Sequence, residues 1–571
     1  MKLSKDQGIR DQKPAVAVAD NRNVWRTSLW AAISFHFSLF IIIGLSRHWG
    51  FMTSINDLGT FDQVVWNTLN GNLLHTTINP FATSMVRLGI HFDPILFLFV
   101  PLYAITPSVE WFAIAQAAAL ALTAYPLFLL GTHIFQSEKS GFIWAVIYLV
   151  NPFLISAGAW DFHPITLAVP FMALALLATV KNRPVTLTLS CLILLACKEH
   201  MGLAVIGFAV LWWWLHRSWR VPTTLFALGA IHLVIVLAVI MPHFSPLGAH
   251  AMLGDELGQM SRYSWLGSSL TEVLRTLLTQ PAFVWGQISQ MGGLSYWGLL
   301  LLPFILFPTL GLPFLLPGVA DLIANTLAAN PMPRGMWSYH SATLIPPLAV
   351  AAMYGVKRLA RWQDRFSIQE LAGLVLITSV VTGYIYLPLP LIGAKNIWSP
   401  NHVLNLPDSD LQRVRSAAGD STILSVQANI GAHFTQRQQI YIYPNKVDEV
   451  DAIILRLESP TTNIGKFQNH STQGSRKGYQ TWLDGHLQLD RTEYLASIEC
   501  LLSNKEFGVQ LWNDPWLVLS KDAETSPLEV ISSLRELRTQ WLIADDEYSS
   551  QLEVFNANVQ THGYCLVASR Q

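Results

Sequence analysis

The sequence has little charge and few cysteines. Only 13% of its 571 residues are Asp, Glu, Lys or Arg, and the net charge is -1, whereas a soluble protein is usually about a quarter charged. This balance leaves no basic field that would attract nucleic acid. No Walker A motif is present, which argues against direct use of ATP. The sequence contains no CxxC or CxxxxH spacing, so its cysteines do not suggest a zinc site.

The four cysteines fall into two groups. Cys191 and Cys197 lie in an apolar run and are typical of core residues. Cys500 and Cys565 lie in the polar C-terminal part of the chain. They could form a disulfide if that part is extracytoplasmic, but their spacing does not decide it.

Long apolar runs dominate the sequence instead. Hydrophobic residues make up 51% of the chain and the mean hydropathy is +0.36. Repeated apolar runs of roughly 15–25 residues predict a polytopic α-helical membrane protein. Residues 1–24 are polar and basic without an apolar core, so we expect a cytoplasmic tail and not a signal peptide. Basic residues that recur between runs, most densely at Lys357–Arg365, place those turns in the cytoplasm.

The transmembrane domain is expected over residues 25–394, with an outer loop at 47–110. We predict that this domain contains about eleven membrane-spanning helices. Pro94–Ala104 is too short to cross and is interpreted as a re-entrant or interfacial piece. Val185–Leu215 is interrupted by Lys198-Glu199-His200, which predicts a hairpin of two short helices with an outer apex. A tight inner turn is expected near Gly311.

The remaining residues, 395–571, predict a soluble extracytoplasmic α/β domain. Charged and polar residues return there, and no apolar run is long enough to span. A helix is expected at Leu487–Ser503 and a loop at 464–485. Short strands are expected at Ser421–Val426, Gln439–Tyr443, Asp451–Leu457, Val509–Trp512 and Trp516–Leu519.

Ionisable residues gather at the predicted outer ends of the spans, where such groups are costly and therefore functional candidates. Asp57 and Asp62 occur in NDLGTFDQVVWN, directly after the first span. On a helix they would be roughly 140° apart and would not share a face. In a turn followed by a helix start they could converge. Either acid could serve as a general base or bind a divalent cation, or simply cap a helix.

Two further pairs have a shared spacing. His91 and Asp93 lie in HFDP, and Asp161 and His163 lie in WDFHP. An i, i+2 pair on an extended segment points to one side, so His91 and Asp93 could join Asp57 around a cation such as Mg²⁺ or Mn²⁺. Asp161 and His163 are candidates for substrate binding. The alternative for both pairs is helix capping before the following proline.

Cationic candidates complete the predicted site. Lys198 could contact a phosphate, with Glu199 orienting it, or the two could form a structural ion pair. Arg334 suits bidentate phosphate binding, with Tyr339 and His340 beside it. The alternative for Arg334 is contact with lipid headgroups at the interface.

Several of these segments together resemble a known family. The text NDLGTFDQVVWN, RLGIHFDPI, WDFHPI, CKEH and SYHSA resembles the bacterial membrane-protein family DUF2079, through the membrane region and into the outer domain. The resemblance to this family does not imply a particular reaction. His200 departs from the family, in which an acidic residue usually follows Lys-Glu, and this puts in doubt a role for a carboxylate there. The layout is also distantly similar to GT-C membrane glycosyltransferases. That similarity implies a catalytic or metal-binding acid in the first outer loop and a polyprenyl-phosphate sugar donor.

The leading hypothesis is therefore a GT-C-type glycosyltransferase of the bacterial inner membrane. It would take a sugar from a polyprenyl-phosphate donor to an extracytoplasmic acceptor. A transporter or lipid flippase would instead predict polar residues spread through the midplane of the membrane. A non-catalytic membrane scaffold, whose outer domain binds a partner, is the third hypothesis.

Overall fold

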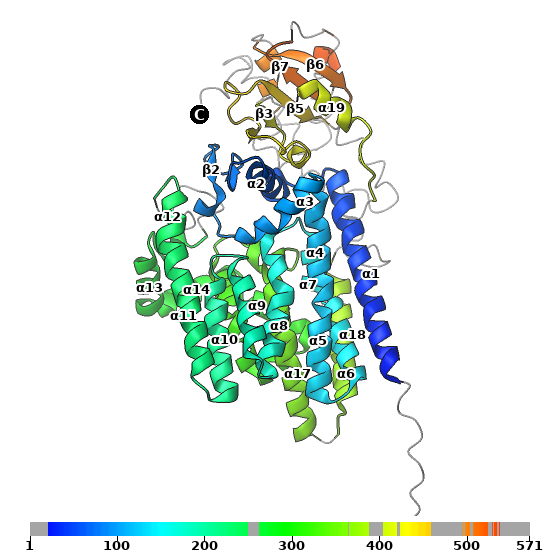
Figure 1. Ribbon diagram of the computed structural model, residues 1–571, viewed down its shortest axis with the longest axis vertical. Helices are drawn as coiled ribbons and strands as arrows, with labels where there is room; N and C mark the ends of the chain where they lie inside the picture. The colour runs from blue at the N-terminus through cyan, green and yellow to red at the C-terminus, as the bar shows by residue number, and fades with distance from the viewer. Residues whose placement is uncertain are drawn as a thin grey trace, which may run out of the picture.

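The computed structural model describes residues 21–248, 262–363, 365–387, 404–419, 423–457 and parts of 494–536. A bundle of long helices carries a small β-sheet domain at one end (Figure 1). We call this end of the bundle the sheet end. Between the two lies segment 50–93, which follows the first helix. The predicted loop at 464–485 and most of the predicted tail at 1–24 lie outside the described residues.

The first half of the bundle runs from α1 to α12. Several helices start as their sequences dictate: Ser137 Oγ caps α6 by accepting from Ser140 N, and α9 has Pro184 at its first position. The elements on either side of segment 50–93 are mostly apolar helices. Before it lies α1 (Asn21–Trp49), and after it come η3 (Pro94–Phe99), α3 (Val100–Ile105), α4 (Glu110–Leu122), α5 (Ala124–Phe135), α6 (Glu138–Leu149), α7 (Pro152–Ala159), η4 (Pro164–Leu167), α8 (Ala168–Val180), α9 (Pro184–Leu195), α10 (Met201–His216), α11 (Arg220–Ile235), η5 (Val236–Ile240) and α12 (Met241–Phe244).

The second half contains shorter pieces and two long helices. The last helix, α18, opens with a capping box in which Ser367 and Glu370 bond each other's backbone N–H groups. The elements are η8 (Ser264–Leu266), α13 (Leu270–Thr279), α14 (Pro281–Gln290), α15 (Gly293–Leu301), η9 (Leu302–Phe304), η10 (Phe307–Gly318), α16 (Val319–Leu327), η11 (Met332–Arg334), η12 (Tyr339–Leu344), α17 (Ile345–Trp362) and α18 (Ile368–Tyr386).

The predicted count of eleven spans is not confirmed. Within the described residues, five helices are long and apolar enough to cross a membrane, or six if α6 and α7, bent by 52°, form one span. Further apolar helices are shorter, among them α9 and α10, which form the predicted hairpin with Lys198–His200 at its turn. The protein is therefore a multi-pass helical membrane protein.

One predicted turn is misplaced. The chain reverses at Ile305 and Leu306, which have φ angles of 53° and 60°, and not near Gly311. Gly311 lies inside η10, where a Cβ would come within 2.2 Å of Ala351 O. The helix is kinked at this glycine, which has φ -122° and ψ 26°, and close packing of η10 on α17 requires a residue without a Cβ there.

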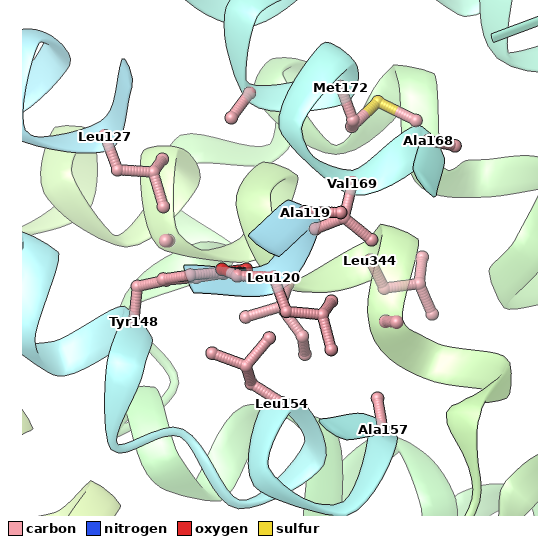
Figure 2. Close-up of a cluster of buried hydrophobic side chains, with 14 of the residues drawn as sticks. Ala119, Leu120, Leu127, Tyr148, Leu154, Ala157, Ala168, Val169, Met172 and Leu344 are labelled. Carbon is pink, nitrogen blue, oxygen red and sulfur yellow. Dashed lines mark hydrogen bonds between the residues drawn. The ribbon is translucent and has the colours of Figure 1, made fainter. Parts of the chain in front are cut away.

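The bundle core is closely packed beneath the sheet end. Figure 2 shows side chains from α4, α6, α7 and α8 meeting Leu344 of η12. Within it Tyr148 OH donates to Leu120 O at 2.9 Å, so its polar atom is satisfied. This core fixes the positions of η12, which carries Tyr339 and His340, and of η4, which directly follows His163.

Segment 50–93 folds over the bundle as short elements. They are η1 (Ile55–Gly59), α2 (Thr60–Leu69), β1 (His75–Thr76), β2 (Met85–Val86) and η2 (Arg87–Gly89), and β1 pairs antiparallel with β2. η1 is a π-helical turn, a form that is frequent at functional sites. It carries Asp57.

The sheet domain has five strands in the order β4-β3-β5-β7-β6. They are β3 (Leu424–Val426), β4 (Ile440–Ile442), β5 (Ala452–Arg456), β6 (Gly508–Asn513) and β7 (Trp516–Ser520), accompanied by α19 (Leu411–Ala418) and η14 (Gly431–His433). All five predicted strands are confirmed. β3 runs parallel to β4 and β5, with Leu424 opposite Ile440 and Ala452, while β7 runs antiparallel to β5 and β6. Only part of the predicted helix 487–503 is described, and those residues are helical.

Both faces of the sheet are covered, which explains its unbroken apolar strands. One face packs on Phe51 and Ile55, and the other on Met52. The domain also hydrogen-bonds segment 50–93: Ile55 N donates to Ala428 O at 3.0 Å, and Thr77 Oγ1 donates to Ile440 O at 2.6 Å. Segment 50–93 and the sheet domain therefore form one packed unit.

Cys500 is disulfide-bonded, whereas Cys191 and Cys197 are free and buried. Cys565, its predicted partner, lies outside the described residues.

Candidate functional site

Asp57 and His163 meet below the sheet domain. η1 brings Asp57 Oδ1 to 3.4 Å from His163 Nε2, and their side chains are 32% and 9% exposed. His163 precedes η4, and its Nδ1 lies 2.9 Å from Asp161 O. A carbonyl only accepts, so Nδ1 carries a hydrogen. Nε2 of the same ring therefore lies within ion-pair distance of the Asp57 carboxylate, while Nδ1 is held by the backbone.

Aromatic stacking continues from this pair. Tyr339 stacks on His163 with ring centroids 3.5 Å apart and on His340 at 4.1 Å. Arg262 Nη1 donates to His340 Nε2 at 3.2 Å. The acceptor nitrogen carries no hydrogen, so His340 is neutral, in agreement with burial, which holds its pKa well below 6.5. A continuous series of side-chain contacts therefore runs from a carboxylate to a cation, through Asp57, His163, Tyr339, His340 and Arg262.

Lys198 faces the same region from the turn between α9 and α10. It lies within electrostatic range of Arg262 and Arg87, two like charges, and of Glu199 and Asp93. Among the described residues, no carboxylate lies within ion-pair distance of Lys198 or Arg262. Two close cations without such partners would be relieved by an anion.

The other predicted acids have close partners. Arg87 holds Asp93 through two nitrogens at 2.8 Å from Oδ2, with both side chains under a tenth exposed. Glu199 Oε1 is 3.1 Å from His91 Nδ1, and its Oε2 accepts from Phe92 N at 3.1 Å. Burial lowers the pKa of His91 to about 3, so the neutral ring donates a hydrogen bond to Glu199.

Asp161 and Asp62 are also engaged. Asp161 accepts from Arg47 Nη2 and from Ser54 N, each at 2.8 Å, which fixes the start of η1. Asp62, only 1% exposed, accepts from Tyr103 OH and Thr435 Oγ1 at 2.5 Å each. Asp62 and Asp57 thus point to different partners, as their spacing predicts.

Burial raises the pKa of Asp62, although Thr435, Tyr103 and Gln436 donate to its carboxyl group and oppose the shift. Its place is the contact between α2 and the sheet domain. The geometry gives Asp62 a structural setting, and its predicted catalytic role stays a prediction.

Arg334 turns away from the cluster. Its guanidinium donates to Ala328 O and to Asn325 O, at the end of α16, and the residue is 7% exposed. These bonds satisfy carbonyls that a helix end leaves unpaired. Nη1 of Arg334 is therefore engaged by carbonyls at the end of α16, and its predicted contact with a phosphate stays a prediction.

The predicted metal set does not assemble. Asp57, His91 and Asp93 contact His163, Glu199 and Arg87 in turn. Among the residues described, no group of three or more His, Cys, Asp or Glu side chains could hold a metal ion. The residues present do not fit a protein-held divalent cation, and Mg²⁺ or Mn²⁺ remains an untested prediction.

Two residues escaped the sequence reasoning. Asp321 of α16 is 5% exposed and accepts from Thr343 Oγ1 at 2.9 Å, while its other oxygen is 2.7 Å from His200 Nε2. A lone acid in an apolar run was the available signal. Arg262 gave no comparable signal, because it lies in a polar loop whose fold the sequence does not predict.

The sequence profile described as "Predicted membrane protein (DUF2079)" matches residues 47–484. The chain belongs to the DUF2079 family. The match covers η1, the Asp57–His163 pair, Lys198 and Arg262, so the candidate site lies wholly within the shared region.

Solved structures give a weaker likeness. The crystal structures of ArnT from Cupriavidus metallidurans, bound to undecaprenyl phosphate and in the apo state, are each 11% identical to this chain with a TM-score of 0.49. The alignments cover 89% and 88% of this chain and 99% of each ArnT chain. These values are too low to assign an activity. No curated protein matches the chain.

Proposed function

We propose that this membrane protein is a glycosyltransferase that moves a sugar from a polyprenyl-phosphate donor to an extracytoplasmic acceptor hydroxyl. The observation that carries the proposal is the Asp57–His163 pair, with its 3.4 Å contact, near two cations, Lys198 and Arg262, that make no direct ion pair with a carboxylate among the described residues. Glycosyl transfer needs both: a base for the acceptor proton and positive charge for the departing phosphate.

The distribution of basic residues and the disulfide support an orientation in which the sheet end of the protein is extracytoplasmic. Near the opposite end of the bundle, Arg26 pairs with Glu138 at 2.8 Å, and Lys357 Nζ donates to Ile134 O at 2.6 Å. Basic residues concentrate on the cytoplasmic side. The disulfide at Cys500 favours an oxidising compartment for the sheet end.

In the proposed step, Asp57 takes the proton of the acceptor hydroxyl, while His163 Nε2, 3.4 Å from Oδ1, keeps the carboxylate in position. The acceptor oxygen bonds to the anomeric carbon of the sugar, and the bond from that carbon to the phosphate oxygen breaks. The phosphate leaves with the bonding electron pair, and Lys198 and Arg262 stabilise its charge. We assign this role to Arg262 and not to Arg334, since Arg334 is bound to helix carbonyls.

The test is release of polyprenyl phosphate by the full-length chain in proteoliposomes, supplied with a panel of polyprenyl-phosphate hexoses and a membrane extract as acceptor. Asp57→Asn is expected to lower the rate about 10²–10⁴-fold, the usual contribution of a general base. Asp448→Asn, an exposed residue of the sheet domain, is the matched control and should leave the rate unchanged.

Two outcomes would overturn the proposal. Equal rates for wild type and Asp57→Asn would remove the base from the mechanism. Movement of the intact donor across the bilayer without sugar transfer would identify a flippase instead.

A further inference from the structure

A second polar space lies where the sheet domain meets the bundle. It is a cavity of about 810 Å³, a size typical of small-molecule sites. We call it the seam cavity. The end of α1, α2 and the start of α4 line one side, and α19 and residues 431–437 line the other. Neither Asp57 nor His163 lines it, so it is separate from the candidate active site.

Two indole rings line the bundle side of the seam cavity. Trp49 is held by its Nε1, which donates to Glu110 Oε1 at 3.0 Å, and Trp66 lies on α2. Both are only partly buried. An aromatic face that is fixed and accessible can pack against the apolar C–H face of a sugar ring.

The carboxylates of the cavity are already occupied. Glu110 accepts from Trp49, Asp408 accepts from Trp516 Nε1 at 3.2 Å, and Asp62 accepts from Thr435 and Tyr103. Each carboxylate is therefore held in a fixed position by a neutral donor of the protein.

Arg415 is the contrasting group. Its Nε and Nη2 donate to His433 O at 3.1 and 2.8 Å, which fixes the guanidinium plane. Within the described ranges no carboxylate pairs with Arg415, and Nη1 has no hydrogen-bond partner. Asp62 acts on it only at longer range. A fixed guanidinium with an open edge is suited to a phosphate or carboxylate.

We propose that the seam cavity is a second ligand site, specific for an anionic sugar whose phosphate or carboxylate binds Arg415 and whose ring packs against Trp49 and Trp66. The inference does not depend on the glycosyltransferase proposal. Such a ligand would touch α1 and α2 on one side and α19 on the other. Binding would therefore stabilise the docking of the sheet domain.

The experiment uses the full-length protein in detergent micelles and in nanodiscs. Glucose 6-phosphate, glucuronic acid, glucose and inorganic phosphate are titrated by calorimetry, and thermal unfolding is recorded with each. The two anionic sugars are expected to bind at least tenfold more tightly than glucose or phosphate and to raise the unfolding temperature.

Arg415→Gln should weaken binding of both anionic sugars at least tenfold. Arg413→Gln is the matched control, because Arg413 is exposed on the same helix and does not line the cavity. If Arg415→Gln fails to fold, Ser416→Trp provides the second variant: it places a bulky side chain in the lining of the cavity and should abolish binding. Asp57→Asn should bind as wild type does, which separates this site from the proposed active site.

Several results would overturn the inference. These are no saturable binding to the wild type, unchanged affinity in Arg415→Gln or Ser416→Trp, and phosphate binding as tight as glucose 6-phosphate. Binding that is lost in nanodiscs of anionic lipid but present in neutral ones would assign the cavity to lipid headgroups instead.

Discussion

Replacing Asp93 by Asn should destabilise the protein by about 3–5 kcal/mol, the range for breaking a buried ion pair from one side. The pair fits that case, since the Arg87 and Asp93 side chains are only 8% and 4% exposed. The substitution keeps the side-chain volume but leaves the guanidinium of Arg87 buried without a counter-charge. Arg87 also lies 4.6 Å over the ring of Phe61, and Phe61 contacts the His163 ring edge-on at 5.7 Å.

A double-mutant cycle isolates the interaction. Arg87→Met should cost a similar amount, because it leaves the Asp93 carboxylate buried and alone. The double variant Arg87→Met/Asp93→Asn should lose less than the sum of the two single variants, since no uncompensated charge remains. The measurement is the free energy of unfolding of the purified full-length chain in mixed micelles.

The exposed pair Lys446–Glu449, 2.7 Å apart with side chains 31% and 62% exposed, is the control cycle. Its coupling should be much weaker than that of the buried pair, because solvent screens exposed charges. Additive losses in the Arg87–Asp93 cycle would refute the buried-pair reasoning. If Asp93 instead bound a cation, Arg87→Met would be mild, and added Mg²⁺ would stabilise the wild type but not Asp93→Asn.

Two further outcomes are expected. Because burial raises the pKa of Asp62, its contribution to stability is fully present below the ordinary Asp pKa of about 3.9 and is lost as pH rises through the folded value. The unfolding temperature of wild type should therefore fall with rising pH relative to that of Asp62→Asn, and parallel curves would contradict this. Arg334→Met should destabilise by about 1–3 kcal/mol, through unpaired carbonyls at the end of α16, without weakening donor binding. Arg262→Gln should instead weaken donor binding without destabilising the protein, as a donor-binding assay would show. If Arg334→Met weakened donor binding, the phosphate-binding role would belong to Arg334.

The sequence predicts those features of the fold that depend on local pattern. Unbroken apolar runs predict the helices, and the charged triplet predicts the turn of the α9–α10 hairpin, which the structure has at Lys198–His200. Short apolar stretches predict all five strands. The turn at Ile305 and Leu306 has no such signal, because neither residue favours a left-handed conformation and nothing local marks it.

The sequence does not predict which residues that are distant along the chain contact each other. Asp62 and Thr435 are 373 positions apart, and His200 and Asp321 are 121 apart. The spacing of Asp57 and Asp62 predicts that they lie on different faces of a helix. It does not predict which of the two the sheet domain buries. The i, i+2 pattern groups His91 with Asp93, whereas each takes a partner of its own, Glu199 and Arg87.

Exposure separates Asp57 from the other predicted acids of the membrane region. The side chains of Asp93, Asp161 and Glu199 are 4–5% exposed, against 32% for Asp57. The buried acids fix the surroundings of Asp57: Asp161 ties Arg47 to Ser54 at the start of η1, and Asp93 holds Arg87 behind Phe61. A carboxylate that reaches solvent from such a rigid frame is pre-organised for a reaction, because its position costs no further ordering when substrate binds. Loss of any one frame acid should therefore lower activity through displacement of Asp57, in proportion to the lost stability, whereas Asp57→Asn should lower activity without lowering stability.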